Sequence, residues 1–173
     1  MYQEKITEMF TQAIRDEFTS AIIYFKMGYA IRGLTATKVA DEIIGHAKEE
    51  FDHAGQVIEY CANHGIDADL EYSIDEERIN NSPTDVEGVI KETQNLETGA
   101  IELYNKIAQF AEDNRDYETR EFATDLMIIE QGHFDDVALF TNQTRGFLNG
   151  ISAMPIDRDS SNDKDAMIVA IPS

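Results

Sequence analysis

Apolar residues recur every three or four positions over four long stretches of the chain, a spacing that forms one face of an α-helix. Prolines occur only at positions 83, 155 and 172, so no residue of this helix-breaking type interrupts the stretches. The pattern therefore predicts an all-α protein with four long helices, over about residues 3–32, 36–64, 83–112 and 117–145.

Local signals predict where these helices begin and end. Glycines are expected to end three of them: Gly33, in the left-handed conformation, Gly65 and Gly146. Ser82 is expected to cap the start of the third helix, with Pro83 at its first position. A capping box from Thr84 to Glu87 offers a rival start two residues later.

The connections between the helices predict the topology. Only a few residues join the first helix to the second and the third to the fourth, so each pair should form an antiparallel hairpin. The 18 residues from Ile66 to Pro83 join the two hairpins and are long enough to cross a bundle from end to end. We therefore predict a four-helix bundle of two antiparallel hairpins with one long crossover, and a short fifth helix over Phe147–Met154.

The chain is expected to divide into a helical domain, residues 1–154, and a C-terminal tail, residues 155–173. The tail begins with a polar stretch and ends in an apolar one, from Ala166 to Ile171. Exposed apolar ends of this kind favour association. We expect the end of the tail to dock in a groove of this subunit, of a neighbour or of a separate shell protein through Met167, Ile168, Val169 and Ile171.

Each apolar stripe contains a glutamate near its middle, and two of the stripes contain a Glu-x-x-His motif. The residues concerned are Glu17, Glu50 with His53, Glu97, and Glu130 with His133. Composition alone would produce only about 0.4 such motifs in a chain of this kind. Because unpaired carboxylates in a core are costly, four that converge there indicate a bound cation.

An internal repeat supports the same site. Four pairs of residues are separated by 80 positions: Glu17 and Glu97, Tyr24 and Tyr104, Glu50 and Glu130, and His53 and His133. Two hairpins related in this way would bring the six polar groups to one level of the bundle.

The ligand types indicate the metal. Positions i and i+3 lie about 60° apart around a helix, so each Glu-x-x-His presents both side chains to one side. Four carboxylates balance the charge of two divalent ions, and mixed oxygen and nitrogen ligands suit iron or manganese. The single Cys61 rules out a four-cysteine site.

In these residues, their order and their spacing, the chain resembles the bacterioferritins over about residues 3–154. The resemblance implies a ferritin-like di-iron centre, in which Glu17 and His53 are terminal ligands of one iron and Glu97 and His133 of the other. Glu50 and Glu130 would bridge the two ions, and Tyr24 would be the tyrosine beside the centre. Bacterioferritins carry a haem-ligating methionine directly after the glutamate of the second helix. Phe51 occupies that position here, so no haem is predicted.

By this resemblance the protein is expected to store and detoxify iron. As a ferroxidase it would oxidise Fe(II) with O2 or H2O2 at two Fe ions per subunit, a site that manganese or zinc can also occupy. The mineral would be held in a homo-oligomeric cage of about 24 subunits. His46 and Glu49 are expected to line the route by which iron enters. Two alternatives are a rubrerythrin-like (erythrin) di-iron peroxidase and a metal-binding cargo subunit that does not store iron.

Composition limits the partners. Against 34 acidic residues the chain has 14 Lys and Arg, a net charge of −20, which opposes binding to a phosphate backbone and favours cations. No nucleic-acid partner is therefore expected. The chain lacks both an apolar run of about 18 residues and a signal-peptide pattern at its start, so we expect no membrane association and a cytoplasmic location.

Overall fold

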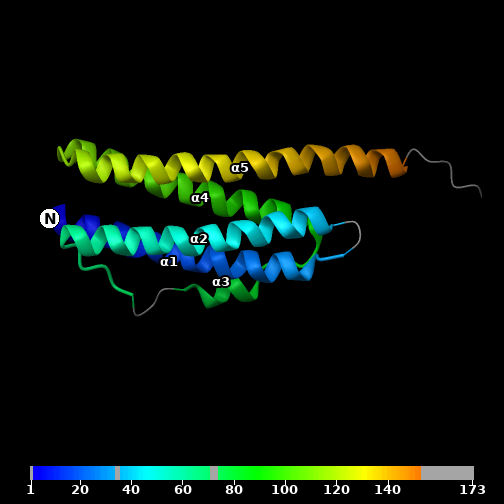
Figure 1. The fold of residues 1–173 in the computed structure, drawn as a ribbon, viewed down its shortest axis with the longest axis horizontal. Coiled ribbons are helices and arrows are strands. Elements are labelled where there is room, and N and C mark those ends of the chain that lie inside the picture. The colour runs from blue at the N-terminus through cyan, green and yellow to red at the C-terminus, as the bar shows by residue number, and fades with distance from the viewer. Residues whose placement is uncertain (1, 34–35, 71–73, 153–173) are drawn as a thin grey trace, which may run out of the picture. The chain divides into compact units, whose positions relative to one another are not determined.

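The computed structural model describes residues 2–33, 36–70 and 74–152, with side chains as far as residue 139. The chain divides into two parts, residues 1–141 and 142–173. The described residues form helices and no strands (Figure 1), with the bounds α1 Tyr2–Ala30, α2 Thr37–His64, α3 Glu76–Asn80, α4 Val86–Asp113 and α5 Tyr117–Ser152.

The predicted topology is confirmed. In the first part of the chain, α1 and α2 form one antiparallel hairpin and α4 and α5 the other, and α1 packs against both α2 and α4 (Figure 1). The crossover carries the short helix α3, which packs on α1 and was not predicted. Asp75 starts α3 by accepting a hydrogen bond from the backbone nitrogen of Arg78. The protein is therefore an all-α four-helix bundle.

Of the two glycines predicted to end the first two helices, one is confirmed and one needs correction. Helix α2 ends as expected at Gly65, which has φ 65° and donates its backbone N–H to the carbonyl of Cys61. Gly33, however, is not left-handed, because the positive φ angles of the described residues belong to Gly65 and Arg115. Arg115 lies in the tight turn between α4 and α5.

Helix α4 begins later than either predicted start. Its N-cap is Asp85, whose side chain accepts a hydrogen bond of 2.9 Å from the nitrogen of Gly88. The predicted starts at Ser82 and Thr84 are both wrong. The Ser82 hydroxyl instead donates to the carbonyl of Ile79, at the end of α3.

The prediction of a break at Gly146 and a separate fifth helix over 147–154 is also wrong. Helix α5 continues through Gly146 to Ser152. A glycine inside a helix costs only about 1 kcal/mol relative to alanine, and no proline lies between positions 83 and 155 to end the helix earlier. The predicted tail, 155–173, and its docking residues lie outside the described residues.

The core consists of two apolar clusters along the bundle. One contains Phe10, Ile14, Val57, Tyr104, Ile107 and Leu126, with others, and the second contains Ile23, Met27, Ala40, Ile43, Val89 and Leu96, with others. On α1, α2 and α4 the predicted glutamates lie between the residues of the two clusters. The polar site therefore occupies a layer within an otherwise apolar interior.

Gly28 allows α1 and α2 to approach closely. A Cβ atom at this position would lie 2.6 Å from Cγ1 of Ile44 and 3.2 Å from the carbonyl oxygen of Ala40.

None of the helices in the described part of the chain is both long enough and apolar enough to span a membrane.

Candidate metal centre

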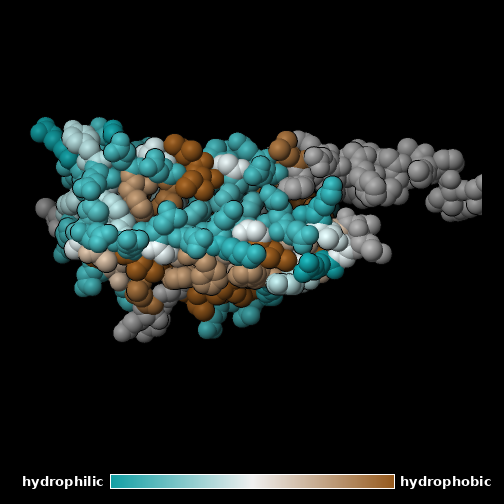
Figure 2. Space-filling view, viewed as in Figure 1, coloured by the Kyte–Doolittle hydropathy of each residue, from teal (hydrophilic) through white to brown (hydrophobic). Residues whose placement is uncertain are grey.

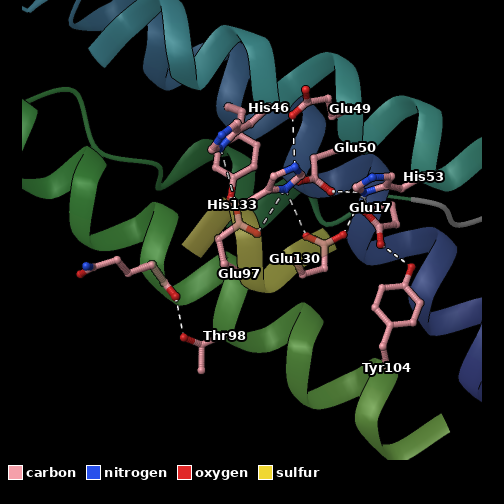
Figure 3. A network of polar contacts seen from close by, with 12 residues as sticks. Glu17, His46, Glu49, Glu50, His53, Glu97, Thr98, Tyr104, Glu130 and His133 are labelled. Carbon is pink, nitrogen blue, oxygen red and sulfur yellow. Dashed lines mark hydrogen bonds and ion pairs between the residues drawn. The ribbon is translucent and has the colours of Figure 1, made fainter. Parts of the chain in front are cut away.

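The six predicted ligands come together inside the bundle, from α1, α2, α4 and α5 (Figure 3). All are buried, with exposed fractions between 0% and 8%: Glu17, Glu50, His53, Glu97, Glu130 and His133. They form two groups of four in which the ligand atoms lie within 4.8 Å of one another. Glu50 and Glu130 belong to both groups.

One half of the centre surrounds His53. Its Nδ1 lies 2.8 Å from Oε1 of Glu130, 3.5 Å from Oε2 of Glu50 and 3.8 Å from Oε2 of Glu17. Glu17 is the carboxylate that belongs to this half alone.

The other half surrounds His133. Its Nδ1 lies 3.5 Å from Oε1 of Glu50, 3.5 Å from Oε2 of Glu130 and 3.8 Å from Oε2 of Glu97. Each of the shared glutamates thus directs one oxygen toward each histidine. Two metal ions in these positions would have two carboxylates in common.

The donor set fits a pair of metal ions. Buried atoms without a hydrogen-bond partner among the described residues include Nδ1 of both histidines, both Oε atoms of Glu130 and Oε1 of Glu50. Although His53 Nδ1 lies 2.8 Å from Glu130 Oε1, neither atom has a partner in hydrogen-bond geometry. Buried polar atoms are ordinarily satisfied, so these unpaired atoms indicate a site for cations.

Two tyrosines hold the unshared glutamates. The hydroxyl of Tyr24 donates a hydrogen bond of 2.5 Å to Oε1 of Glu97, and that of Tyr104 donates to Oε1 of Glu17. Burial, followed by the nearby carboxylates, raises the pKa of both hydroxyls well above the ordinary value, so they remain donors. Sequence reasoning assigned Tyr24 to the site and gave Tyr104 only as its repeat partner, a packing and hydrogen-bonding residue; the structure places the two in equivalent roles.

The metal-free carboxylates divide into two kinds. Burial, and then repulsion from Glu50, raise the pKa of Glu17 well above its usual value and that of Glu97 to about 10. Burial opposes ionisation of Glu50 and Glu130 too, but their neighbours, including both histidines, hold the pKa of each below its ordinary value. The shared pair therefore carries the negative charge.

The two histidines carry the balancing positive charge. Burial disfavours their protonation, but Glu130 and Glu50 outweigh it and raise the pKa of His53 to about 9 and that of His133 to about 11. These shifts favour protonated histidines beside two ionised shared carboxylates.

The two residues expected on the iron route differ in exposure. His46 is buried, with 3% of its surface exposed, and its ring stacks on that of His133 at a centroid distance of 4.5 Å. Burial, and then His133, lower the pKa of His46. The side chain of Glu49 is 54% exposed and lies 3.1 Å from Nε2 of His133. Sequence reasoning placed His46 near the site but did not predict that its side chain is buried.

Phe51 lies on the outside of the bundle. It is 42% exposed and contacts the rings of Phe18 and Phe25, with centroid distances of 5.6 and 6.3 Å. Figure 2 shows hydrophobic side chains gathered over the face of α1 and α2. A phenyl ring offers no lone pair to a haem iron, and the absence of haem stays a prediction.

A helical bundle whose core holds a carboxylate from each of four helices, with Glu-x-x-His on two of them, has the architecture of the dinuclear carboxylate proteins. The profile of the ferritin-like domain family matches residues 7–147. The chain belongs to this family.

A comparison with curated protein sequences finds no match. Among solved structures the chain is similar to a bacterioferritin of Rhodobacter capsulatus, described with a metal-free dinuclear site and haem iron. The two chains are 21% identical and superpose with a TM-score of 0.70, over 89% of this chain and 96% of that one. This likeness supports the fold.

Proposed function

We propose that the protein is a ferroxidase that oxidises Fe(II) to Fe(III) and stores the product as mineral in an oligomeric cage. The observation that carries the proposal is the pair of overlapping four-ligand groups that share Glu50 and Glu130. Two Fe(II) ions give up two electrons in total, which with two protons reduce O2 to H2O2, or H2O2 to water.

The residues of the chain have separate tasks in this reaction. Glu50 and Glu130 hold both ions close together, because each directs oxygens toward both histidines. Tyr24 and Tyr104 fix the orientation of the unshared carboxylates by hydrogen bonds. The four carboxylates together neutralise two divalent ions, which favours binding in an apolar interior.

Iron reaches the centre, on this proposal, past Glu49 and His46. Glu49 is exposed and contacts the His133 ring, so it links solvent to a ligand of the centre. Manganese and zinc can occupy the same oxygen and nitrogen ligands.

The cage is proposed to be a cytoplasmic homo-oligomer of about 24 subunits. The exposed ring of Phe51, with Phe18 and Phe25 beside it, supports a subunit contact on the face of α1 and α2.

The test compares Fe(II) oxidation in wild type with Glu130→Ala and Glu50→Ala, by stopped-flow absorbance under O2 and under H2O2. Both variants should lose the rapid phase, because each change removes a ligand of both ions, while Glu121→Ala, an exposed position of α5, should oxidise iron normally. Rapid oxidation by Glu130→Ala at the wild-type rate would refute the assignment.

Native mass spectrometry after iron loading separates storage from the alternatives. A large assembly that retains many irons per subunit supports the cage. A dimer that turns over H2O2 without retaining iron would instead indicate an erythrin-type peroxidase.

A further inference from the structure

The internal repeat of the centre is broken at one buried position. The repeat pairs each ligand with its counterpart 80 residues later, and the residue that corresponds to His46 is Leu126. Both are buried, with 3% and 2% of their surfaces exposed. One half of the centre thus has an additional imidazole where the other half has an apolar side chain.

The ring of His46 faces the centre on one side. Its Nδ1 lies 3.8 Å from Oε1 of Glu97 and has no hydrogen-bond partner among the described side chains. His46, Glu97 and His133 each offer a ligand atom, and the three atoms lie within 4.8 Å of one another. Figure 3 shows these three residues together at one end of the network, with His53 and Glu17 at the other.

The other nitrogen of the ring faces carboxylates. Nε2 of His46 lies 3.9 Å from Oε1 of Glu42, and Asp136 belongs to the same group of potential ligands. Histidines that bind metals ordinarily direct their second nitrogen toward a carboxylate or carbonyl, which leaves the first nitrogen free as a ligand. The surroundings of His46 match this arrangement.

We propose that His46 is a seventh protein ligand of the dinuclear centre, binding through Nδ1 the metal held by Glu97 and His133. This inference rests on the proposed function, since it requires metal ions at that centre. Its consequence is that the two metal positions are unequal. The Glu97 position has two imidazoles and binds tightly, while the Glu17 position has His53 alone and binds more weakly.

The first experiment uses Zn(II) alone, titrated into the metal-free wild-type protein against a chromophoric chelator. We expect two steps of one ion per subunit each, with dissociation constants separated by about ten-fold or more, the scale on which even indirect contacts change metal affinity. In His46→Leu, which installs the residue of the repeat partner, the tighter step should weaken by about ten-fold or more.

A matched control is His64→Leu. His64 lies on the same helix, pairs with Glu118 and has a 31% exposed side chain, so this variant should bind zinc as wild type does. The reciprocal change Leu126→His should tighten the weaker step instead. An unchanged tight step in a folded His46→Leu variant would overturn the inference.

The second experiment is a crystal structure of the Zn(II)-loaded wild type with anomalous scattering, which does not depend on any variant folding. His46 Nδ1 should lie about 2.1 Å from one zinc ion that also contacts Glu97. The inference fails if His46 binds zinc only with Glu42 and Asp136, or binds none. If both zinc ions occupy the centre without His46, the proposed function stands. If the centre takes up no metal, the proposed function is refuted as well.

Discussion

Loading the centre with divalent metal should release about four protons for every two ions near pH 7, since ligands must lose their protons to bind. This expectation follows from four groups of the centre whose pKa values are raised, which favours their protonated forms: Glu17, Glu97, His53 and His133. Glu50 and Glu130 are already ionised there, since the pKa of each is lowered. We therefore expect the centre to exchange four protons for the four positive charges of two divalent ions.

The pH dependence of the metal-binding free energy follows from this number of protons. Each proton contributes about 1.4 kcal/mol per pH unit, so four make the combined binding of two ions stronger by about 5 kcal/mol for each unit of rising pH near neutrality. Isothermal titration of Zn(II) in two buffers of different ionisation enthalpy measures the protons released. Glu97→Gln should release about one fewer, and Glu121→Gln, an exposed control, should release as many as wild type. Release of two protons or fewer would refute the charge assignment.

The same groups determine the stability of the metal-free fold. The pKa values of His53 and His133 are raised above that of histidine in an unfolded chain, so both residues stabilise the fold fully below about pH 6.5. This stabilisation is lost as the pH rises through about 9 for His53 and about 11 for His133. Glu97, with its pKa raised to about 10, acts in the same direction. Metal-free protein should therefore melt at a lower temperature at pH 9 than at pH 6.5. Equal melting temperatures would contradict this reasoning.

Three further predictions concern other parts of the chain. Asp116 is half-buried, which raises its pKa, but hydrogen bonds from Tyr2 and Thr119 outweigh this effect and lower the pKa. Its contribution to the stability of the fold is therefore present above the pKa of the unfolded state and is lost as the pH falls through the pKa of the folded state. Asp116 directly precedes α5 and accepts a hydrogen bond of 3.1 Å from the backbone nitrogen of Thr119, as an N-cap does. Asp116→Ala should therefore cost about 1 kcal/mol in urea unfolding at pH 7 and less in acid, and a loss that does not change with pH would contradict this capping role. Gly28→Ala should destabilise the fold by about 1–3 kcal/mol, because the added Cβ would lie 2.6 Å from a side-chain carbon of Ile44 in α2. This clash should outweigh the higher helix propensity of alanine. A variant more stable than wild type in urea unfolding would contradict the close packing of α1 and α2. Protein expressed with ample haem should show no Soret absorption, whereas a stoichiometric haem spectrum would show that Phe51 does not prevent haem binding.

The sequence by itself determined the four long helices, their hairpin order and the composition of the centre. These features are local, since an apolar stripe needs only the helical period and a Glu-x-x-His needs only one turn of helix. The equal spacing of Glu17 to Glu50 and of Glu97 to Glu130 also placed both hairpins at one level without reference to any contact.

The tertiary structure alone decided which further groups meet the six predicted ligands. The pairing of Tyr104 with Glu17 joins α4 to α1, and the burial of His46 against His133 joins α2 to α5. Such contacts depend on the rotation and axial offset of one helix against another, which no local pattern contains. The tertiary structure also decided where helix α4 begins. Several residues near the start of α4 could cap it, and Asp85 does so because the backbone there places its carboxylate against Gly88 while Ser82 is engaged by α3.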